Sequence, residues 1–389
     1  MTTTPTAVGP EAPLAADLHL PTAYGRVGRL FDVLVRSVVP VVLALVAGGV
    51  LLLALGKNPL TFYGDIWTGG IENGGWQNSG IRMAPFLLIA AGLTVIFRAN
   101  IWNLGYNGQF LLGAALVSGY APSLEGHLPL WFAFTILFLL AGAVGAAWTL
   151  VPALLKAWYG TNEIITTLMM SFIGIDVAQI LIKGPFHDPT TPLPQTRNIN
   201  DLLPPIPGTG DRPGIHIGLL VALAAVLVVH YMLTRTAWGL RLQVLGANPR
   251  AARHFGIDLK RLVVVSFLAS GFLVGLAAAA DILGLWGYIR TSWNPAYGDT
   301  IIPFVFLARL NALAVVPFIA FFSVISTGGD LAAANANLST DFLLVLVALI
   351  LLFMTVIEFM GRRRELGQSY LTPGLKQALR APLYRKRPA

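Results

Sequence analysis

Long runs without a single charged residue constrain this chain more than any other feature. The eight longest candidates are residues 37–56, 83–97, 99–124, 126–155, 213–234, 262–280, 310–329 and 342–357. A helix that crosses the hydrocarbon core of a bilayer needs about 20 apolar residues, and most of these runs are long enough. Only 11% of all residues are charged, compared with roughly 25% in an ordinary soluble domain. A polytopic membrane protein is therefore predicted.

Two further stretches complete the predicted set of spans. Residues 164–182 are apolar apart from Asp176 and Gln179, and residues 300–308 are too short to cross and are predicted to form a half-helix. The predicted fold class is thus an all-α polytopic membrane protein with about ten transmembrane helices, including short or broken ones. No small-residue cleavage site follows the first apolar run, so that run is predicted to stay as an anchor and not to be removed as a signal peptide.

The distribution of lysine and arginine predicts the orientation. If ten spans leave both termini inside the cell, the inner segments hold 20 of the 26 basic residues. Such an excess is typical of cytoplasmic loops, so both termini are predicted to be cytoplasmic. The net charge of +8 then forms a rim that contacts anionic membrane lipid, and no nucleic-acid partner is predicted.

One membrane domain is predicted, covering residues 37–360. It follows a cytoplasmic, partly disordered extension (1–36) and precedes a basic cytoplasmic tail (361–389). Residues 57–82 contain two pairs of adjacent glycines, at 69–70 and 74–75, and are predicted to be an outer loop. The proline-rich segment 184–214 is predicted to be an irregular outer loop over the helices.

Amide and aromatic side chains gather at the start of the third apolar run. Residues 98–109 contain Trp102, Asn103, Asn107 and Gln109, and Phe110 follows. Polar groups at membrane depth are tolerated only when they are buried in protein or line a wet cavity. Two interpretations remain open, because amides also join helices by hydrogen bonds. The functional interpretation is a path for sugars or nucleosides, whose hydroxyls and ring faces suit amides and aromatics.

A second polar strip begins at residue 160. Thr161 is predicted to cap a helix, and Glu163 in its first turn favours the positive helix end. The strip continues along the same helix, and its candidate path residues are Asn162, Glu163, Thr166 and Thr167. Asp176, farther along, is predicted to face the bundle interior with a partner, because a carboxylate in lipid is costly. Asp281 is the only other candidate acid for a proton relay, which leaves an ion-coupled mechanism weakly supported.

On the predicted cytoplasmic side, residues 235–261 form the one sizeable polar segment between spans. Asn248-Pro249 can start a short helix and Gly256 can end it. The prediction is a short basic helix to which another protein binds, and the alternative is a solvated, positively charged loop. The candidate contact residues are Gly246, Ala247, Asn248, Arg250, Ala251 and Arg253.

Several kinds of chemistry find no support in the sequence. The chain has no cysteine and no phosphate-binding loop, because Gly56-Lys57 lacks the required flanking residues. No nucleophile elbow, paired catalytic carboxylates or zinc motif is present. We therefore expect no enzymatic activity, no cofactor and no metal.

At these segments the chain resembles the permease subunits of ATP-binding-cassette (ABC) importers, in the group that includes ribose, galactose, nucleoside and branched-chain amino acid permeases. Ala99–Gln109 is similar to the family pattern AGLFNIGAEGQ, residues 160–169 to GTNEVIxTxM, and residues 246–257 to a loop that couples the permease to its ATPase. Asn107 replaces the usual glutamate of the first pattern. The flanking sequence is closest to the nucleoside and simple-sugar type.

The resemblance implies the partners. They are a second permease subunit, as a homodimer or heterodimer, a cytoplasmic ATPase, and an extracytoplasmic substrate-binding protein, all at the bacterial inner membrane. Each permease forms half of the translocation pathway. The alternatives are a branched-chain amino acid permease and, from another class, an ion-coupled secondary transporter.

Overall fold

The computed structural model of the chain describes residues 26–209, 214–339 and 341–365. All regular structure within these ranges is helical, apart from three isolated β-bridges. The predictions for residues 1–25 and 366–389 lie outside the described part of the chain.

Helices occupy all ten segments predicted to contain one. In chain order the elements are α1 (Arg26–Ala54), α2 (Pro59–Gly70), α3 (Gly75–Arg98), α4 (Tyr106–Leu124), α5 (Leu130–Leu154), η1 (Leu155–Tyr159), α6 (Glu163–Lys183), α7 (Gly218–Arg235), α8 (Ala237–Ala247), α9 (Pro249–His254), α10 (Leu259–Asp281), η2 (Ile282–Trp286), α11 (Tyr297–Leu307), α12 (Ala312–Asn335) and α13 (Phe342–Glu365). The first and last helices extend past the predicted domain boundaries at residues 36 and 361.

Seven helices in the described residues are long and apolar enough to cross a membrane: α3, α5 with η1, α6, α7, α10 with η2, α12 and α13. Val38–Ala54 of α1 and all of α11 form shorter apolar helices. Helix α4 is not among these seven helices, and its amides Asn107 and Gln109 make it more polar than they are. A polytopic α-helical membrane protein is therefore confirmed, and the full number of crossings remains a prediction.

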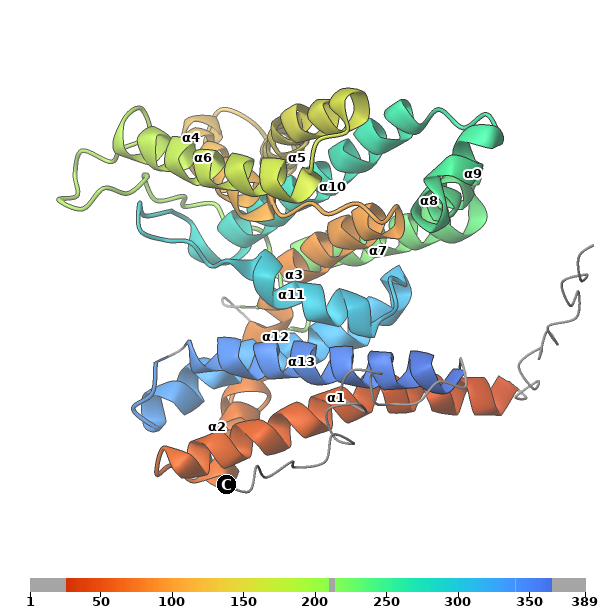
Figure 1. Ribbon diagram of the computed structural model, residues 1–389. Helices are drawn as coiled ribbons and strands as arrows, with labels where there is room; N and C mark the ends of the chain where they lie inside the picture. Colours follow the sequence, from red (N-terminus) through yellow and green to blue (C-terminus); the bar gives the residue numbers. More distant parts are fainter. Residues whose placement is uncertain (1–25, 210–213, 340, 366–389) are drawn as a thin grey trace, which may run out of the picture.

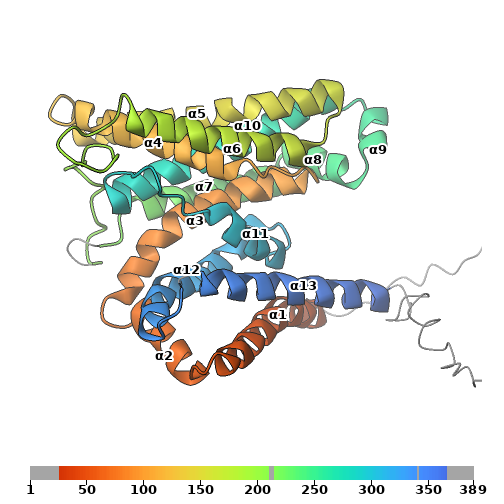
Figure 2. The same ribbon diagram turned by 60° about the vertical axis from the view of Figure 1, so that its left-hand side comes forward.

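The helices gather into two groups on either side of α11 (Figures 1 and 2). One group contains α3 to α7 and α10, and the other contains α1, α2, α12 and α13. The start of α1, the end of α13, α8 and α9 all lie at one end of the molecule (Figure 1), and α2 lies toward the opposite end. This arrangement places the described ends of the chain on the side that carries α8 and α9.

Small residues bring α5 and α10 into close contact. A Cβ atom added at Gly145 would overlap the carbonyl of Gly271, and one added at Gly275 would overlap the carbonyl of Ala141. Close backbone approach is typical of helix pairs in membranes. The α5–α10 pair forms the centre of the larger group.

The prediction of a loop over residues 57–82 is wrong. Asn58 accepts a hydrogen bond from the Leu60 amide at 2.9 Å and starts α2, with Pro59 at the first helical position, a favoured site for proline. The paired glycines serve packing instead of flexibility, because a Cβ at Gly69 would lie 3.1 Å from the Cα of Gly328 on α12. Glycine at a helix contact was misread as glycine in a loop.

The segment 184–209 is irregular, as predicted, and packs on the helices. Its backbone pairs with the segment after α10: the amide of Ile199 donates to the Gly287 carbonyl at 2.8 Å, and that of Leu203 to the Leu283 carbonyl at 2.8 Å. Farther along, burial lowers the pKa of the His216 imidazole to about 4, against a smaller opposing effect of the Ile81 backbone. This segment is therefore a packed cover and not a free loop.

Candidate functional site

The backbone between α3 and α4, residues 99–105, is not helical; its Asn103 side chain is buried, whereas Asn100 is exposed. Asn103 and Gln109 are 0% and 1% exposed. The Asn103 amide donates to the Gln109 carbonyl oxygen at 3.3 Å, and the Gln109 amide donates to the Asn103 oxygen at 3.1 Å. Asn103 also donates to the Ser270 hydroxyl at 3.3 Å. We call Asn103, Gln109 and Ser270 the amide network; it joins α4 to α10.

The polar strip of α6 binds the same region from the other side. The Thr167 hydroxyl accepts a hydrogen bond from the Leu104 amide at 3.1 Å, and the Ser171 hydroxyl accepts one from the Gly108 amide at 3.1 Å. A Cβ at Gly108 would lie 2.9 Å from the Cα of Ser171. These hydroxyls satisfy backbone groups that helix ends leave unpaired.

Four of the predicted path residues, Asn103, Gln109, Phe110 and Thr167, are buried in this chain. The side chains of the three polar ones form hydrogen bonds to other parts of the chain. These contacts correspond to the alternative interpretation, hydrogen bonding between helices. Trp102 is half-buried and packs against Phe97 and Phe306, with ring centroids 4.9 and 5.7 Å apart.

Asn107 belongs to a different group of side chains, which reaches the surface. Its amide donates to Asp299 Oδ2 at 3.0 Å, and the Tyr106 hydroxyl donates to Asp299 Oδ1 at 2.5 Å. Asn107 is half-buried, and Asp299, in the first turn of α11, is exposed. We call Tyr106, Asn107 and Asp299 the Asp299 cluster. The 11 residues of α11 span about 16 Å, which is about half of a bilayer core of about 30 Å.

Aromatic rings lie next to the Asp299 cluster. The ring centroid of Trp293 is 6.0 Å from that of Phe110 and 5.5 Å from that of Trp286. The ring of Tyr297 packs edge-on against Phe110 at 5.5 Å. A carboxylate, an amide and a phenol beside aromatic rings can bind hydroxyl groups and ring faces.

Asn162, Glu163 and Thr166 lie at the first turn of α6 and not with the Asp299 cluster. The helix cap is Asn162, whose oxygen accepts from the Ile164 amide at 2.9 Å. The predicted cap, Thr161, is therefore wrong; its buried hydroxyl has no partner among the described residues. Glu163 pairs with Lys156 of η1 at 2.6 Å, and the half-buried Thr166 hydroxyl donates to the Asn162 carbonyl at 3.2 Å.

The two carboxylates in the apolar helices have opposite surroundings. Asp176 is exposed on the outward face of α6, without a hydrogen bond or ion pair to any described residue, so the prediction of an inward partner is wrong. Asp281 is 2% exposed and interacts with Tyr297 and Trp286 near Arg82. Arg82 in turn pairs with Asp330 of α12 at 2.8 Å.

The segment 235–261 folds into two helices, α8 and α9, where the sequence predicted one. Asn248 caps α9 by accepting from the amides of Arg250 and Ala251 at 3.0 and 3.1 Å. Gly256, at a φ of +71°, follows its end, as predicted. Arg250 and Arg253 are exposed, and Ala252 is buried at 0% exposure. Helix α9 thus packs against the protein through the side that carries Ala252 and exposes Arg250 and Arg253.

The start of α9 is tied to the centre of the bundle through Arg98. A Cβ at Gly246 would lie 2.5 Å from the Arg98 carbonyl, so α8 and the end of α3 approach closely. The Arg98 guanidinium donates to the Leu310 carbonyl at 3.3 Å. It also donates to Gln243 of α8 when the Gln243 amide is oriented with its oxygen toward Arg98. A force applied to α8 and α9 therefore reaches α3 and the turn between α11 and α12 through direct contacts.

Sequence reasoning missed two residues of these sites. Asp299 was not among the predicted path residues. The signal available in the sequence was an acidic residue directly before an apolar half-helix. Phe255 is 78% exposed beside the arginines of α9; a phenylalanine inside a basic polar segment was the corresponding signal. Among the described residues no group of three or more histidines, cysteines or acids could hold a metal ion.

Comparisons with known proteins agree with the resemblance found in the sequence. A family model described as the permease component of branched-chain amino acid transport systems matches residues 77–355. The glucose ABC transporter permease protein of Haloferax volcanii is 32% identical over 84% of this chain and 88% of its own length. The guanosine ABC transporter permease protein of Bacillus subtilis is 25% identical over 88% of this chain and 99% of its own. No solved structure gives a significant match.

A nucleoside ABC transporter permease protein of Lactococcus lactis is 24% identical over 82% of this chain and 89% of its own length. The resemblance to the nucleoside and simple-sugar type is thereby confirmed. The matched region runs from α3 into α13 and contains the amide network, the Asp299 cluster and α9. This chain belongs to the family of ABC-importer permease components and is a multi-pass membrane subunit of such a transporter.

Proposed function

We propose that the chain forms half of the translocation pathway for a nucleoside or simple sugar. A second permease subunit would supply the other half, in the bacterial inner membrane with both termini in the cytoplasm. The relatives named for glucose, guanosine and nucleoside transport support this substrate class. A branched-chain amino acid remains the alternative, because the family description names it.

The observation that carries the proposal is the exposed Asp299 cluster. A carboxylate at mid-membrane depth is costly in lipid, by about 2.5–3.5 kcal/mol on insertion scales. It must therefore face water or protein, which is the environment of a pathway between two subunits. The path residues we retain from the sequence are Trp102, Asn107 and Thr166, to which the structure adds Asp299. The buried amides support this surface from behind.

Neutral ring compounds fit this surface better than a zwitterion. The hydroxyl groups of a sugar or ribose can donate to Asp299 and accept from Asn107, and a ring face can rest on Trp293. The same surface offers a carboxylate but no cation for the carboxylate of an amino acid. Asp176 on α6 would also face the second subunit and not lipid.

Energy and selection would come from other subunits. The chain lacks a phosphate-binding loop, so a separate cytoplasmic ATPase would hydrolyse ATP and grip α9. An extracytoplasmic binding protein would capture the substrate and dock on the side opposite α8 and α9. The purified chain alone should then show no ATP hydrolysis above a contaminant control.

Uptake of labelled nucleoside, glucose and leucine by cells that express the whole system tests the proposal. We expect uptake of nucleoside or glucose. Asp299→Ala should reduce it at least about tenfold, because a hydrogen bond to a charged group contributes about 1.5–3 kcal/mol. The matched control is Asp65→Asn on α2, away from the cluster, with protein levels measured for both. Uptake of leucine alone would overturn the substrate class, and normal uptake by Asp299→Ala would overturn the path.

A further inference from the structure

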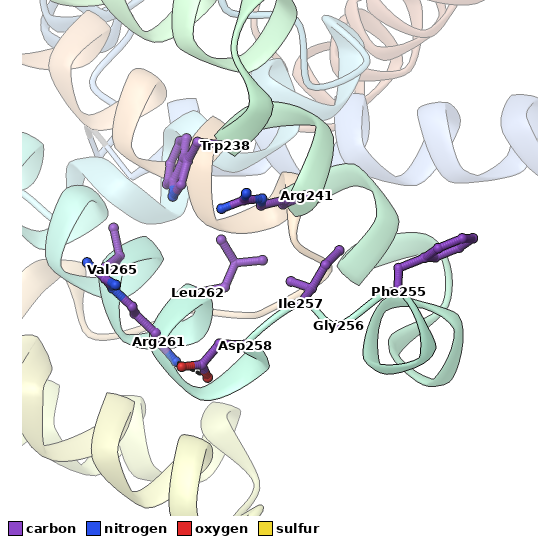
Figure 3. A pocket seen from close by; sticks show the side chains of 9 residues that line it. All are labelled: Trp238, Arg241, Phe255, Gly256, Ile257, Asp258, Arg261, Leu262 and Val265. Carbon is purple, nitrogen blue, oxygen red and sulfur yellow. Dashed lines mark hydrogen bonds between the residues drawn. The ribbon is translucent and has the colours of Figure 1, made fainter.

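A cavity of about 510 Å³ lies between α8 and the start of α10. Trp238 and Arg241 of α8 form one wall, and Arg261, Leu262 and Val265 of α10 form the other (Figure 3). It adjoins α9 but contains neither Arg250 nor Arg253. It shares Phe255 with the surface assigned above to the ATPase, but its cations are different ones.

Two cations of this cavity have no partner within the described part of the chain. Arg241 and Arg261 are exposed, and neither side chain makes a hydrogen bond or ion pair there. The one acid in the lining, Asp258, is already engaged, because its Oδ1 accepts from the Arg261 backbone amide at 3.1 Å and caps α10. The cavity consequently has a net positive charge.

A third donor is buried and unsatisfied. The indole nitrogen of Trp238 is inaccessible to solvent and has no acceptor among the described residues. Figure 3 shows the Trp238 nitrogen and the Arg241 guanidinium turned into the cavity, with Arg261 along the far side next to Val265. An unpaired buried donor costs about 1–3 kcal/mol. Three donors without an acceptor favour an anion with several oxygens, and guanidinium groups bind phosphate with two hydrogen bonds.

The position of the cavity along the membrane-spanning helix α10 indicates which kind of molecule contains that anion. Residues 262–280 of α10 are uncharged, so the cavity lies where the polar surface changes to the membrane-spanning surface. Lys260 lies 5.6 Å from the ring centroid of Trp158, which is 54% exposed, and exposed tryptophans are typical of this interface. Val265, on the membrane side of the cavity, is 38% exposed. A ligand with a charged head and an apolar tail fits both parts.

We propose that this cavity binds the phosphate headgroup of an anionic phospholipid of the cytoplasmic leaflet, with an acyl chain along Leu262 and Val265. Basic pockets between transmembrane helices on the cytoplasmic side are suited to such headgroups. An acidic side chain of a cytosolic protein could reach the arginines but not the apolar wall. Since α8 leads directly into α9, the bound lipid would hold the base of the coupling helix against α10. The site rests on the cytoplasmic placement of α8 and α9 but not on the transported substrate.

The test uses the full chain purified from membranes and reconstituted with phosphatidylcholine and phosphatidylglycerol. Native mass spectrometry then measures the phosphatidylglycerol retained by each variant. We expect Arg241→Gln with Arg261→Gln to reduce retention by about tenfold or more, since each basic residue near an anionic surface contributes about 1 kcal/mol. Arg250→Gln with Arg253→Gln removes the same charge from α9 and should change retention little. Trp238→Phe, which keeps the ring and removes the N–H donor, should reduce retention less than the arginine pair.

Three results would overturn the proposal. Equal losses in both arginine pairs would mean that only the general positive charge attracts lipid. Thermal stabilisation by inorganic phosphate as large as that by phosphatidylglycerol would mean a site for free phosphate. Unchanged lipid retention with lost ATPase binding in the Arg241 and Arg261 variant would mean that the cavity receives a protein side chain. Uptake of any substrate class leaves these outcomes unaffected, so failure here is distinguishable from failure of the transport proposal.

Discussion

The amide network and the helix α9 are both rich in polar side chains, but they use them in opposite ways. Asn103 and Gln109 are almost completely buried, and each satisfies the other at 3.1 and 3.3 Å. On α9, Asn248 satisfies only the backbone of its own helix. Arg250 and Arg253 remain exposed, next to an exposed Phe255.

The difference separates polar groups that assemble the protein from polar groups that recognise something else. Buried groups are hydrogen-bonded because the cost of leaving them unpaired is high. An exposed charge without a partner is hydrated, so leaving it unpaired costs little free energy. Aromatic and arginine side chains together are typical of interface anchors. Changes in the amide network should therefore alter stability, and changes on α9 should alter association.

The largest expected effect is on the packing that surrounds the amide network. Gly275→Leu places a side chain where even a Cβ overlaps the Ala141 carbonyl, so α5 and α10 must separate. Overpacking a tight contact costs about 1–3 kcal/mol and occasionally more, and we expect the upper end here. The measurement is the fraction of monodisperse protein in detergent after heating. Gly64→Leu is the matched control, because a Cβ at Gly64 meets no atom within 4 Å.

If Gly64→Leu destabilised the protein as much as Gly275→Leu, helix propensity or expression would explain the loss. The close α5–α10 contact would then have no special role. The comparison requires a large difference between the two variants.

The second effect should appear in association and not in stability. Arg250→Glu with Arg253→Glu reverses two charges on α9. Exposed ion pairs contribute about 0.2–1 kcal/mol each, and reversal adds repulsion, so we expect a total of about 2 kcal/mol and a loss of more than tenfold in ATPase co-purification. The melting temperature should stay within error of the unmodified protein.

Lys183→Glu with Arg197→Glu is the control, since both residues belong to segments predicted to lie outside the cell. It should leave ATPase association unchanged. Normal ATPase binding and transport by the α9 variant would remove α9 from the coupling mechanism, and a drop in its melting temperature would show that its arginines also stabilise the fold.

The sequence predicted the helices better than the direction in which their side chains point. Uncharged runs located ten helical segments, because the length of an apolar run is a local property. Asn248, Pro249 and Gly256 likewise predicted α9, because capping and left-handed glycine are local too. The prediction for residues 57–82 was wrong because glycines at a helix contact and glycines in a loop look the same in a sequence. Only the position of α12 distinguishes them.

Burial of individual polar residues could not be predicted in the same way. Asn103 and Asn107 are four residues apart in one motif, but Asn103 faces α10 and Asn107 faces Asp299, 192 residues away. Asp176 was assigned a buried position from the cost of charge in lipid, which requires a suitable environment but does not identify it. The proposed second subunit would provide such an environment for Asp176, and a single sequence carries no record of such a contact.

The smallest expected effect concerns the amide network itself. Asn103→Leu removes its hydrogen bonds to Gln109 and Ser270 and leaves a buried amide unpaired. Hydrogen bonds between membrane helices contribute about 0.6 kcal/mol on average and at most about 1.7, so we expect a loss of about 1 kcal/mol in detergent melting. The double variant Asn103→Leu with Gln109→Leu should recover part of it, because replacing both partners by apolar groups is nearly neutral. Recovery should be incomplete, since Asn103 also accepts from the Gly105 amide at 3.0 Å. Uptake, corrected for the amount of folded protein, should change little in either variant. An unchanged melting temperature with slower uptake would mean that Asn103 faces the substrate in another conformation of the transporter. Burial of Asn103 in this structure would then not identify it as a residue that only holds the helices together.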